Sequence, residues 1–551
     1  MALQKNVTAY NDSVISNIVC KKESRTSVLL SFLCFFLHLR PKTTAMPKKI
    51  TSALISVYYK DRLDEIVKRL AGLGVTIYST GGTLKFIHDL GVNAEAVEDL
   101  TGFPEILGGR VKTLHPKVFG GILARRDNPN DTLQLAQHQI PLIDLVIVDL
   151  YPFEETVKST TDEQTIIEKI DIGGIALIRA TAKNFKDTLI VSDRNHYGDL
   201  IELLDAKQGE TSIEDRKRFA AKAFATSSNY DTQIFNYFNK TEELPVFKQS
   251  LHASQTLRYG ENPHQKGTYY GDLNEVFDVL NGRELSYNNL VDVEASVNLV
   301  AEFAEPAFAI IKHTNSCGLA VRENVLEAYK AAYACDPTSA FGGVLATNRK
   351  VDAATANEMN SLFFEVLTAP DYDADALEIL KQKRNRIILK QKVQIGTKKI
   401  FKSLLNGVLE QDIDFSSETR ETYKTVTDKT PTDAQLSDLE FAIKAVKHLK
   451  SNGITLVKNK QLIGMGCGQT SRVDALESAI KKSKAFGFDL QGAVMASEAF
   501  FPFPDCVNIA NEAGIVAIAQ PGGSIKDADS ISAANANGQA MVFTGIRHFK
   551  H

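Results

Sequence analysis

A lysine and a histidine stand side by side at positions 312 and 313, at the end of an apolar run and just before a turn of small polar residues. The run, residues 307–311, is typical of a buried strand. Catalytic groups commonly lie where a rigid strand delivers them into a loop. A histidine exchanges protons near neutral pH, and an adjacent ammonium binds an anion or keeps the imidazole neutral. Lys312 and His313 are therefore candidate acid–base residues, although such a pair alone is more often a solvated loop.

A second polar cluster occupies residues 108–116, with the sequence GGRVKTLHP. Two glycines precede two fixed cations, and Arg110 and Lys112 alternate, so extended backbone turns both toward one side. Three polar residues follow glycine-rich or apolar segments further along the chain, and together with this cluster they form an anion-binding and acid–base set: Tyr151, Asp171 and Lys183.

A third candidate site is the segment TGGT at residues 80–83, between an expected strand and an expected helix. Glycines permit close backbone approach, hydroxyls donate hydrogen bonds, and a helix N-terminus offers N–H groups to an anion. Taken alone, such a Gly-Gly pair is more often only a turn. The polar residues after the preceding strand complete a predicted phosphate cradle, which comprises Ser56, Tyr58, Lys60, Thr80, Gly81, Gly82 and Thr83.

The elements that must position these residues alternate between strands and helices. Strands are expected at 52–57, 75–78 and 142–150, with helices at 61–73 and 84–90. This alternation predicts a doubly wound parallel sheet, in which ligands bind outside the carboxyl ends of strands. A helix at 219–238 and a polar linker at 239–251 follow. We therefore expect an N-terminal α/β domain at 46–238.

A second α/β domain is expected at 252–551, with helices at 291–302 and 438–449. No internal repeat is evident in the sequence. The glycines at 464, 466 and 468 lack dinucleotide-binding spacing, and we interpret them as a tight turn against a substrate.

Composition excludes several classes of protein. The 551 residues carry a net charge of −4 and no tryptophan, which disfavours nucleic-acid binding. The six cysteines form no C-x-x-C pair, which argues against a zinc site or disulfide framework and suits a reducing cytosol. The apolar stretch 27–39 is too short to span a bilayer, which needs about 20 residues. We interpret residues 1–45 as a disordered extension or gene-start artefact rather than a signal peptide, with Met46 as the working start.

Several motifs in fixed order resemble the bifunctional purine-biosynthesis enzymes that combine a formyltransferase with inosine monophosphate cyclohydrolase. The first half carries GGRVKTLHP (108–116), LYPF (150–153), IDIGG (170–174) and AKN (182–184). The second half carries LRYGENPHQ (257–265), LNGRELSYNNL (280–290), SAFGG (339–343), SNG (451–453), IGMGCGQTSR (463–472), SEAFFPFPD (497–505) and RHFKH (547–551). The resemblance covers roughly residues 49–551.

The resemblance implies a formyl transfer in the second half, from 10-formyltetrahydrofolate to 5-aminoimidazole-4-carboxamide ribonucleotide. The attacking amine is a poor nucleophile, so the reaction needs a base and stabilisation of an oxyanion. By resemblance, His313 accepts the proton, Lys312 assists it and Asn452 donates to the oxyanion. The implied substrate-binding residues are Arg258, Tyr259, Asn289, Glu365 and Arg547.

The resemblance implies ring closure to inosine monophosphate in the first half. Lys112, Tyr151, Asp171 and Lys183 would surround the reacting groups, and which of them is the general acid stays open. Arg110 and Thr113, with the cradle at 80–83, would hold the nucleotide. A competing hypothesis keeps this half as a non-catalytic phosphate sensor.

The implied folds are a methylglyoxal-synthase-like sheet in the first half and a cytidine-deaminase-like α/β layout in the second. A zinc deaminase is the third hypothesis, but H-x-E with P-C-x-x-C is missing from the sequence, so no metal site is expected. The resemblance also implies a cytoplasmic homodimer with formyltransferase sites at the subunit interface. It implies small-molecule nucleotide and folate substrates, no tightly bound cofactor, and no nucleic-acid or membrane partner.

Overall fold

The structure is a computed structural model that describes residues 47–394, 396 and 399–551. The interpretation of residues 1–45, and of Met46 as the start, lies outside the described residues. The chain divides into two compact units, with the boundary along the chain between Ser250 and Leu251, and each is described by itself. Among the helices of the described residues, none has the length and apolar character needed to cross a membrane.

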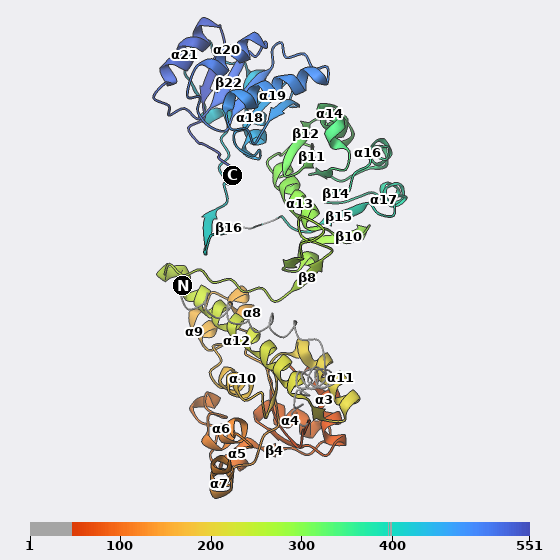
Figure 1. Ribbon diagram of the computed structural model, residues 1–551, viewed down its shortest axis with the longest axis vertical. Coiled ribbons are helices and arrows are strands. Elements are labelled where there is room, and N and C mark those ends of the chain that lie inside the picture. The colour runs from red at the N-terminus through yellow and green to blue at the C-terminus, as the bar shows by residue number, and fades with distance from the viewer. Residues whose placement is uncertain (1–46, 395, 397–398) are drawn as a thin grey trace, which may run out of the picture. The chain divides into compact units, whose positions relative to one another are not determined.

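The first unit, coloured red to yellow-green in Figure 1, is built on a parallel sheet. The sheet has five strands in the order β4-β3-β2-β5-β6. Its strands are β2 (Ser52–Ser56), β3 (Thr76–Ser79), β4 (Glu95–Ala96), β5 (Leu145–Val148) and β6 (Leu189–Val191). A separate antiparallel pair consists of β1 (Lys48–Lys49) and β7 (Glu210–Thr211). The central strands β2 and β5 are almost entirely buried because both faces of a parallel sheet are covered by helices.

The helices of this unit are α3 (Leu63–Gly72), α4 (Gly81–Asp89), α5 (Val97–Thr101), α6 (Pro116–Leu123), α7 (Pro129–Gln137), α8 (Phe153–Ser159), α9 (Glu163–Ile167), α10 (Gly173–Lys183), α11 (Tyr197–Lys207) and α12 (Ile213–Glu242). The connections from β2 run toward β4, whereas those from β5 run toward β6. With right-handed crossovers, such opposed connections place helices on opposite faces, which makes the sheet doubly wound as predicted. The switch point therefore lies between β2 and β5.

The expected elements of this unit are confirmed with shifted ends. Helix α4 begins at Gly81, so the predicted Gly-Gly cradle forms the first turn of the helix rather than a loop before it. Helix α12 continues to Glu242, four residues into the stretch interpreted as a linker. A capping box at its start, between Ser212 and Asp215, explains why the helix begins ahead of residue 219.

The second unit contains two six-stranded mixed sheets with the same topology. One has the order β10-β15-β14-β13-β11-β12, and the other β18-β23-β22-β21-β19-β20. In each sheet an antiparallel hairpin is followed by three parallel strands, and a further antiparallel strand pairs with the last of them. The sequence interpretation found no repeat, and the structure corrects it because the repetition is one of topology.

The strands of the first sheet are β10 (Phe277–Asn281), β11 (Ala307–Lys312), β12 (Asn315–Val321), β13 (Val344–Thr347), β14 (Val366–Ala369) and β15 (Ile387–Gln391). Those of the second are β18 (Lys424–Thr425), β19 (Ile454–Val457), β20 (Leu462–Gly466), β21 (Val494–Ser497), β22 (Ala517–Gln520) and β23 (Ala540–Phe543). The two sheets meet where Val321 N donates to Lys460 O at 3.0 Å, and they share one apolar core.

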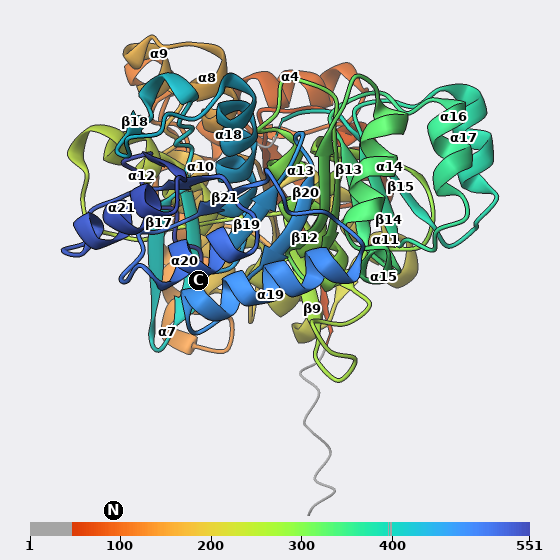
Figure 2. The same cartoon turned by 90° about the horizontal axis from the view of Figure 1, so that it is seen from above.

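The helices of this unit are α13 (Tyr287–Val300), α14 (Val325–Cys335), α15 (Pro337–Ala340), α16 (Ala353–Met359), α17 (Ala374–Lys381), α18 (Asp433–Lys447), α19 (Arg472–Ala485), α20 (Asp505–Glu512) and α21 (Asp527–Ala536). Figure 2 shows α19 beside β19 and β20, against which it packs. Two further hairpins are β8 (Ser254–Leu257) with β9 (Gly267–Tyr270), and β16 (Lys399–Leu404) with β17 (Gly407–Asp412).

Candidate active sites

The switch point of the first unit holds a buried carboxylate. Asp149 directly follows β5, and its side chain accepts hydrogen bonds from the backbone N–H groups of Tyr58 and Tyr59, the latter at 3.0 Å. Burial raises the pKa of Asp149 to about 6, against the opposing effect of these two N–H donors. Sequence reasoning missed this residue. Its position after a buried strand, at the edge where ligands were expected, was the available signal.

The predicted phosphate cradle comes together at this edge. Ser56 Oγ lies 3.2 Å from Thr80 Oγ1, and Thr83 Oγ1 donates to Val57 O at 2.9 Å. Lys60 turns its ammonium group back to the carbonyls of its own loop, with Tyr58 O at 3.2 Å. Burial lowers the pKa of Lys60. The loop after β2 and the start of α4 therefore form one hydroxyl-lined corner.

Lys112 links this corner to the segment 108–116. Its Nζ pairs with Glu105 at 3.0 Å and lies 3.5 Å from where a Cβ on Gly81 would stand. A Cβ on Gly109, which has φ +89°, would lie 2.8 Å from Lys112 Cε. The glycines therefore make room for the lysine.

The neighbouring residues of that segment lie close to the start of α10. Thr113 is buried, and its Oγ1 is 3.4 Å from the position of a Cβ on Gly173, the first residue of α10. Arg110 is exposed and pairs with Glu168, with Nε and Oε2 3.3 Å apart. An anionic ligand would replace this carboxylate partner.

Tyr151 and Asp171 border the same corner. The rings of Tyr58 and Tyr151 meet edge to face at 5.9 Å, and Lys169 Nζ lies 5.6 and 5.8 Å from their centroids. Asp171 Oδ1 accepts from Gly174 N at 2.6 Å, and its own N–H donates to Tyr230 Oη at 2.9 Å. Burial raises the pKa of Asp171. Lys169 was not predicted, because a lone lysine before IDIGG gives no pattern.

Lys183 is the last residue of α10, about 15 Å along the helix axis from Gly173, its first residue. The next residue, Asn184, donates to Ile122 O at 2.7 Å and to Ala124 O, at the end of α6. The position of Lys183 is therefore set by the packing of the end of α10 against the end of α6.

The second candidate site is the turn between β11 and β12. His313 and Thr314 are its two central residues, with φ values of 53° and 65°. Both positive values are those of a tight hairpin turn, and a β-branched threonine there is a costly choice. Asp292 of α13 holds the turn by accepting from Thr314 N at 2.7 Å and from His313 N at 3.3 Å. Burial raises the pKa of Asp292. This aspartate was missed by sequence reasoning.

The equivalent turn of the second sheet has the same construction. Asn459 and Lys460 have φ values of 54° and 50°, and Asp438 of α18 accepts from their N–H groups at 2.8 and 2.7 Å. The carboxylate is thus a feature of the repeated fold, while the histidine occurs in one copy only.

The His313 turn lies beside the loop that carries Asn452. Asn315 Oδ1 accepts from Lys450 N at 3.0 Å and so ties the two segments together. Lys312 Nζ donates to Phe341 O at 2.6 Å. The structure thus brings the turn of Lys312 and His313 and the loop of Asn452 into one region of the second unit.

Buried charges orient the amide of Asn452. Its Oδ1 accepts from Arg472 at 2.9 Å, and its Nδ2 donates to Gln469 O at 3.0 Å and to Thr470 O at 3.3 Å. Arg472 pairs in turn with the fully buried Glu498 at 2.9 Å. The motifs SNG, GQTSR and SEAFF therefore form a single network.

The predicted substrate-binding residues have different local partners. Glu365 accepts from Asn289 Nδ2 at 2.8 Å and from Arg283 at 3.2 Å, and it borders a cavity of about 480 Å³. Asn289 is buried and caps α13 with Ser286, so its amide already has a structural role. Arg258 donates to Tyr259 Oη at 3.0 Å. The guanidinium of Arg547 stacks on the ring of Phe549 at 4.4 Å.

The glycines at 464 and 466 have a role other than the expected substrate turn. Both lie in β20, and a Cβ on Gly464 or Gly466 would stand 2.6 Å from Ala479 O or 1.9 Å from Ala475 O. They allow α19 to pack closely on the strand. The interpretation as a turn against the substrate is therefore wrong for these two glycines.

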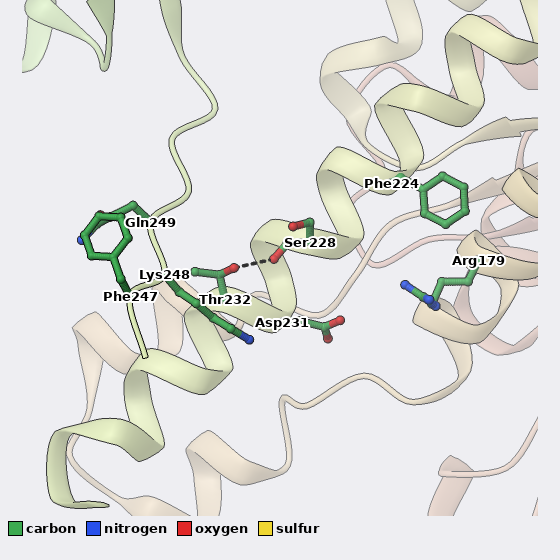
Figure 3. A pocket seen from close by; sticks show the side chains of 8 residues that line it. All are labelled: Arg179, Phe224, Ser228, Asp231, Thr232, Phe247, Lys248 and Gln249. Atoms are coloured by element: carbon green, nitrogen blue, oxygen red, sulfur yellow. Dashed lines mark hydrogen bonds between the residues drawn. The ribbon is translucent and has the colours of Figure 1, made fainter. Parts of the chain in front are cut away.

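A cavity of about 640 Å³ lies elsewhere in the first unit, between α10, α12 and the segment after α12 (Figure 3). Thr232 Oγ1 donates to Ser228 O at its wall, at 2.7 Å. The lining residues are Arg179, Phe224, Ser228, Asp231, Thr232, Phe247, Lys248 and Gln249. The predicted site residues are all outside this set.

Comparisons with known proteins match both halves of the chain. A family model described as "AICARFT/IMPCHase bienzyme" matches residues 181–482, and one described as "MGS-like domain" matches residues 62–176. "Bifunctional purine biosynthesis protein PurH" of Bacteroides thetaiotaomicron is 58% identical over 504 residues, which cover 92% of this chain and 99% of the relative. Proteins of the same name from Persephonella marina and Aquifex aeolicus are 48% and 47% identical, cover 91% of this chain, and are themselves covered over 99% and 100%.

Proposed function

Because the chain belongs to the AICARFT/IMPCHase bienzyme family, we propose that its two units house the two reactions at the sites described above. The protein is a bifunctional enzyme of purine biosynthesis with formyltransferase and inosine monophosphate cyclohydrolase activities. It transfers a formyl group from the cosubstrate 10-formyltetrahydrofolate to 5-aminoimidazole-4-carboxamide ribonucleotide. It then closes the ring of the formyl intermediate with loss of water.

We place formyl transfer at the β11–β12 turn, because Asn315 ties the His313 turn to the loop of Asn452. The substrate amine attacks the formyl carbon, and His313 accepts the proton that the amine loses. The bond from the formyl carbon to the folate nitrogen breaks, and Lys312 delivers a proton to that nitrogen. Asn452 donates to the oxyanion by exchanging one of its two bonds to the carbonyls of Gln469 and Thr470.

The nucleotide phosphate in this unit requires cations and oriented donors. We assign this role to Arg258 with Tyr259, and to Arg547, because a guanidinium grips phosphate through two parallel hydrogen bonds. Glu365, held by Asn289 and Arg283, lies at the edge of the 480 Å³ cavity and would contact the folate.

We place ring closure at the switch point of the first unit. The amide nitrogen of the intermediate attacks its formyl carbon, and the formyl oxygen leaves as water. Lys112 lies beside Gly81 and Tyr151 lies beside Tyr58, so both border the corner that would hold the intermediate. We assign to them the polarisation of the formyl oxygen, and to Asp171 the orientation of the amide. The 80–83 corner and Arg110 with Thr113 hold the phosphate. Lys183, the last residue of α10, assists proton transfer as part of the same proposed set.

The test follows formyl intermediate and inosine monophosphate separately in the full-length enzyme. His313→Asn places an asparagine in the β11–β12 turn, as in the equivalent β19–β20 turn, where Asn459 has this position. The variant should lose formyl transfer but still cyclise supplied intermediate. Lys112→Ala should do the reverse, and Asn459→Ala is the matched control for the turn. A wild type that formylates but does not cyclise would show that the first unit is a phosphate sensor.

We further propose that the enzyme is a homodimer. Hairpin β16–β17 exposes every residue of both strands, including Leu404, Val408 and Leu409, yet an isolated two-stranded hairpin is only marginally stable in water. A second copy of the chain would cover these side chains and bring formyltransferase sites to the interface. Sedimentation of the wild type at twice the chain mass, and at the chain mass for Leu409→Lys, would support this assignment.

Two finer assignments complete the proposal. The repeated hairpin-plus-parallel topology supports a cytidine-deaminase-like layout without a zinc site, since the sequence contains no H-x-E with P-C-x-x-C. Metal analysis of the purified enzyme tests this. The free, buried thiols of Cys317, Cys335 and Cys506 suit a reducing cytoplasm, which cell fractionation tests.

A further inference from the structure

A buried histidine close to the C-terminus is bonded on both sides of its ring. His548 is 2% exposed, and its Nδ1 lies 2.6 Å from Asp414 Oδ2. Its Nε2 lies 2.8 and 3.0 Å from the two carboxylate oxygens of Glu418, which is itself buried. The segment that follows β17 thus grips the last residues of the chain through one imidazole ring.

These contacts require a charged ring. Ionised carboxylates only accept hydrogen bonds, so both ring nitrogens must donate, and that occurs only in the imidazolium. Burial alone would lower the pKa of His548, but the hydrogen bonds to Glu418 and Asp414 raise it above the ordinary value. Other charged or titratable groups face these carboxylates and the tail: Lys447 of α18, the buried His448 directly after α18, Glu302, which pairs with both, Tyr423 before β18, Arg472 of α19, Glu498 after β21, Glu294 of α13, and Lys550 of the tail itself.

The tail that His548 anchors contacts the Asn452 loop from two directions. Ser451 N donates to Lys550 O at 2.9 Å, and Lys550 N donates to Ser451 Oγ at 3.1 Å. His548 N donates to the carbonyl of Glu498 at 2.9 Å, and Glu498 is the acid that pairs with Arg472. The residue before Asn452 and the pair that orients its amide are therefore both bonded to the tail.

We propose that His548 is a positioning residue for formyl transfer: its imidazolium fixes the C-terminal tail and, through the tail, Asn452 and the neighbouring Arg547. This inference rests on the proposed function of the second unit. His548 does not touch the reacting atoms. It acts by joining three segments, 414–418, 451–452 and 498, that the sequence keeps far apart.

The experiment compares full-length wild type with His548→Gln and with His252→Gln, a control in the same unit whose side chain is exposed. We expect His548→Gln to lower kcat for formyl transfer by about 10-fold to 100-fold, the order of loss when a catalytic group is displaced by about 1 Å. Cyclisation of supplied intermediate should be unchanged. Carboxypeptidase digestion, followed by intact mass, should trim the tail of the variant and spare that of the control.

The pH dependence separates positioning from general stability. Because the pKa of His548 is raised in the folded state, the stability that the imidazolium bonds contribute is fully present below the ordinary pKa of histidine and is lost as pH rises through the raised pKa. Trimming of the wild-type tail, measured relative to the variant at each pH, should therefore increase toward alkaline pH. Asp414→Asn, which removes the negative charge of one of the two partners at a half-exposed position, should give intermediate trimming and serves if His548→Gln fails to fold.

Two results would overturn the inference: a His548→Gln tail as resistant as that of the wild type, or a freed tail with formyl transfer at the wild-type rate. A wild type that lacks formyl transfer altogether would instead refute the proposed function, because the digestion readout does not depend on activity.

Discussion

Replacement of Asp292 by asparagine tests whether the geometry of the His313 turn controls formyl transfer. Asp292 accepts from both central N–H groups of that turn. An asparagine keeps one acceptor oxygen for Thr314 N but turns an NH₂ group toward His313 N, so one bond to a charged acceptor is lost. Such bonds contribute about 1.5–3 kcal/mol. If the whole loss appears in the barrier, kcat falls by about 10-fold to 160-fold, at about 1.36 kcal/mol per tenfold.

The repeated fold supplies a matched control for this experiment. Asp438→Asn makes the same chemical change at the equivalent turn, where Asp438 accepts from Asn459 N and Lys460 N. Formyl transfer is assayed at saturating substrates, with cyclisation of supplied intermediate as the internal reference. The reasoning is refuted if Asp438→Asn lowers kcat as much as Asp292→Asn, or if Asp292→Asn leaves kcat unchanged.

Three further predictions concern single side chains. Gly466→Ala should abolish formyl transfer by disrupting the second unit, because its Cβ would stand 1.9 Å from Ala475 O. Loss of soluble protein, or loss of a cooperative unfolding transition, checks this prediction. Lys183→Ala should lower cyclisation of supplied intermediate and leave formyl transfer unchanged, since Lys183 belongs to the proposed cyclohydrolase set, and separate assays of the two reactions check this. Asp149 has a pKa raised from 3.8 to about 6, so its ionisation costs stability as pH rises through that window, by about 3 kcal/mol at 1.36 kcal/mol per unit. Urea inactivation of cyclohydrolase should therefore show a steeper loss of stability between about pH 4 and pH 6 for wild type than for Asp149→Asn.

Much of the fold could be predicted from local sequence pattern. The apolar run before Lys312 is β11, and the alternation after residue 49 is a doubly wound sheet, because buried strands and amphipathic helices have distinct periods. The ends were less predictable. Helix α4 begins at Gly81, since a glycine is acceptable in the first turn of a helix, where the backbone N–H groups have no partner within the helix.

The residues that position the site were not predictable in the same way. Asp149 and Asp292 act through backbone N–H groups that come from distant segments, and a single aspartate carries no spacing that reveals this. The glycines at 464 and 466 were misread because a sequence cannot distinguish a glycine that approaches a ligand from one that approaches a helix. The repeated topology was not predicted because two segments can share a strand order without having similar amino-acid sequences.

The second unit contains two turns that are held by an aspartate in the same way but carry different side chains. One turn carries Lys-His-Thr and the other Lys-Asn-Lys, and each has two central residues with positive φ whose N–H groups are held by an aspartate. The fold therefore requires only that the two central residues of this turn adopt positive φ angles. The side chain at position 313 is therefore not dictated by the turn, and the histidine there is available for chemistry.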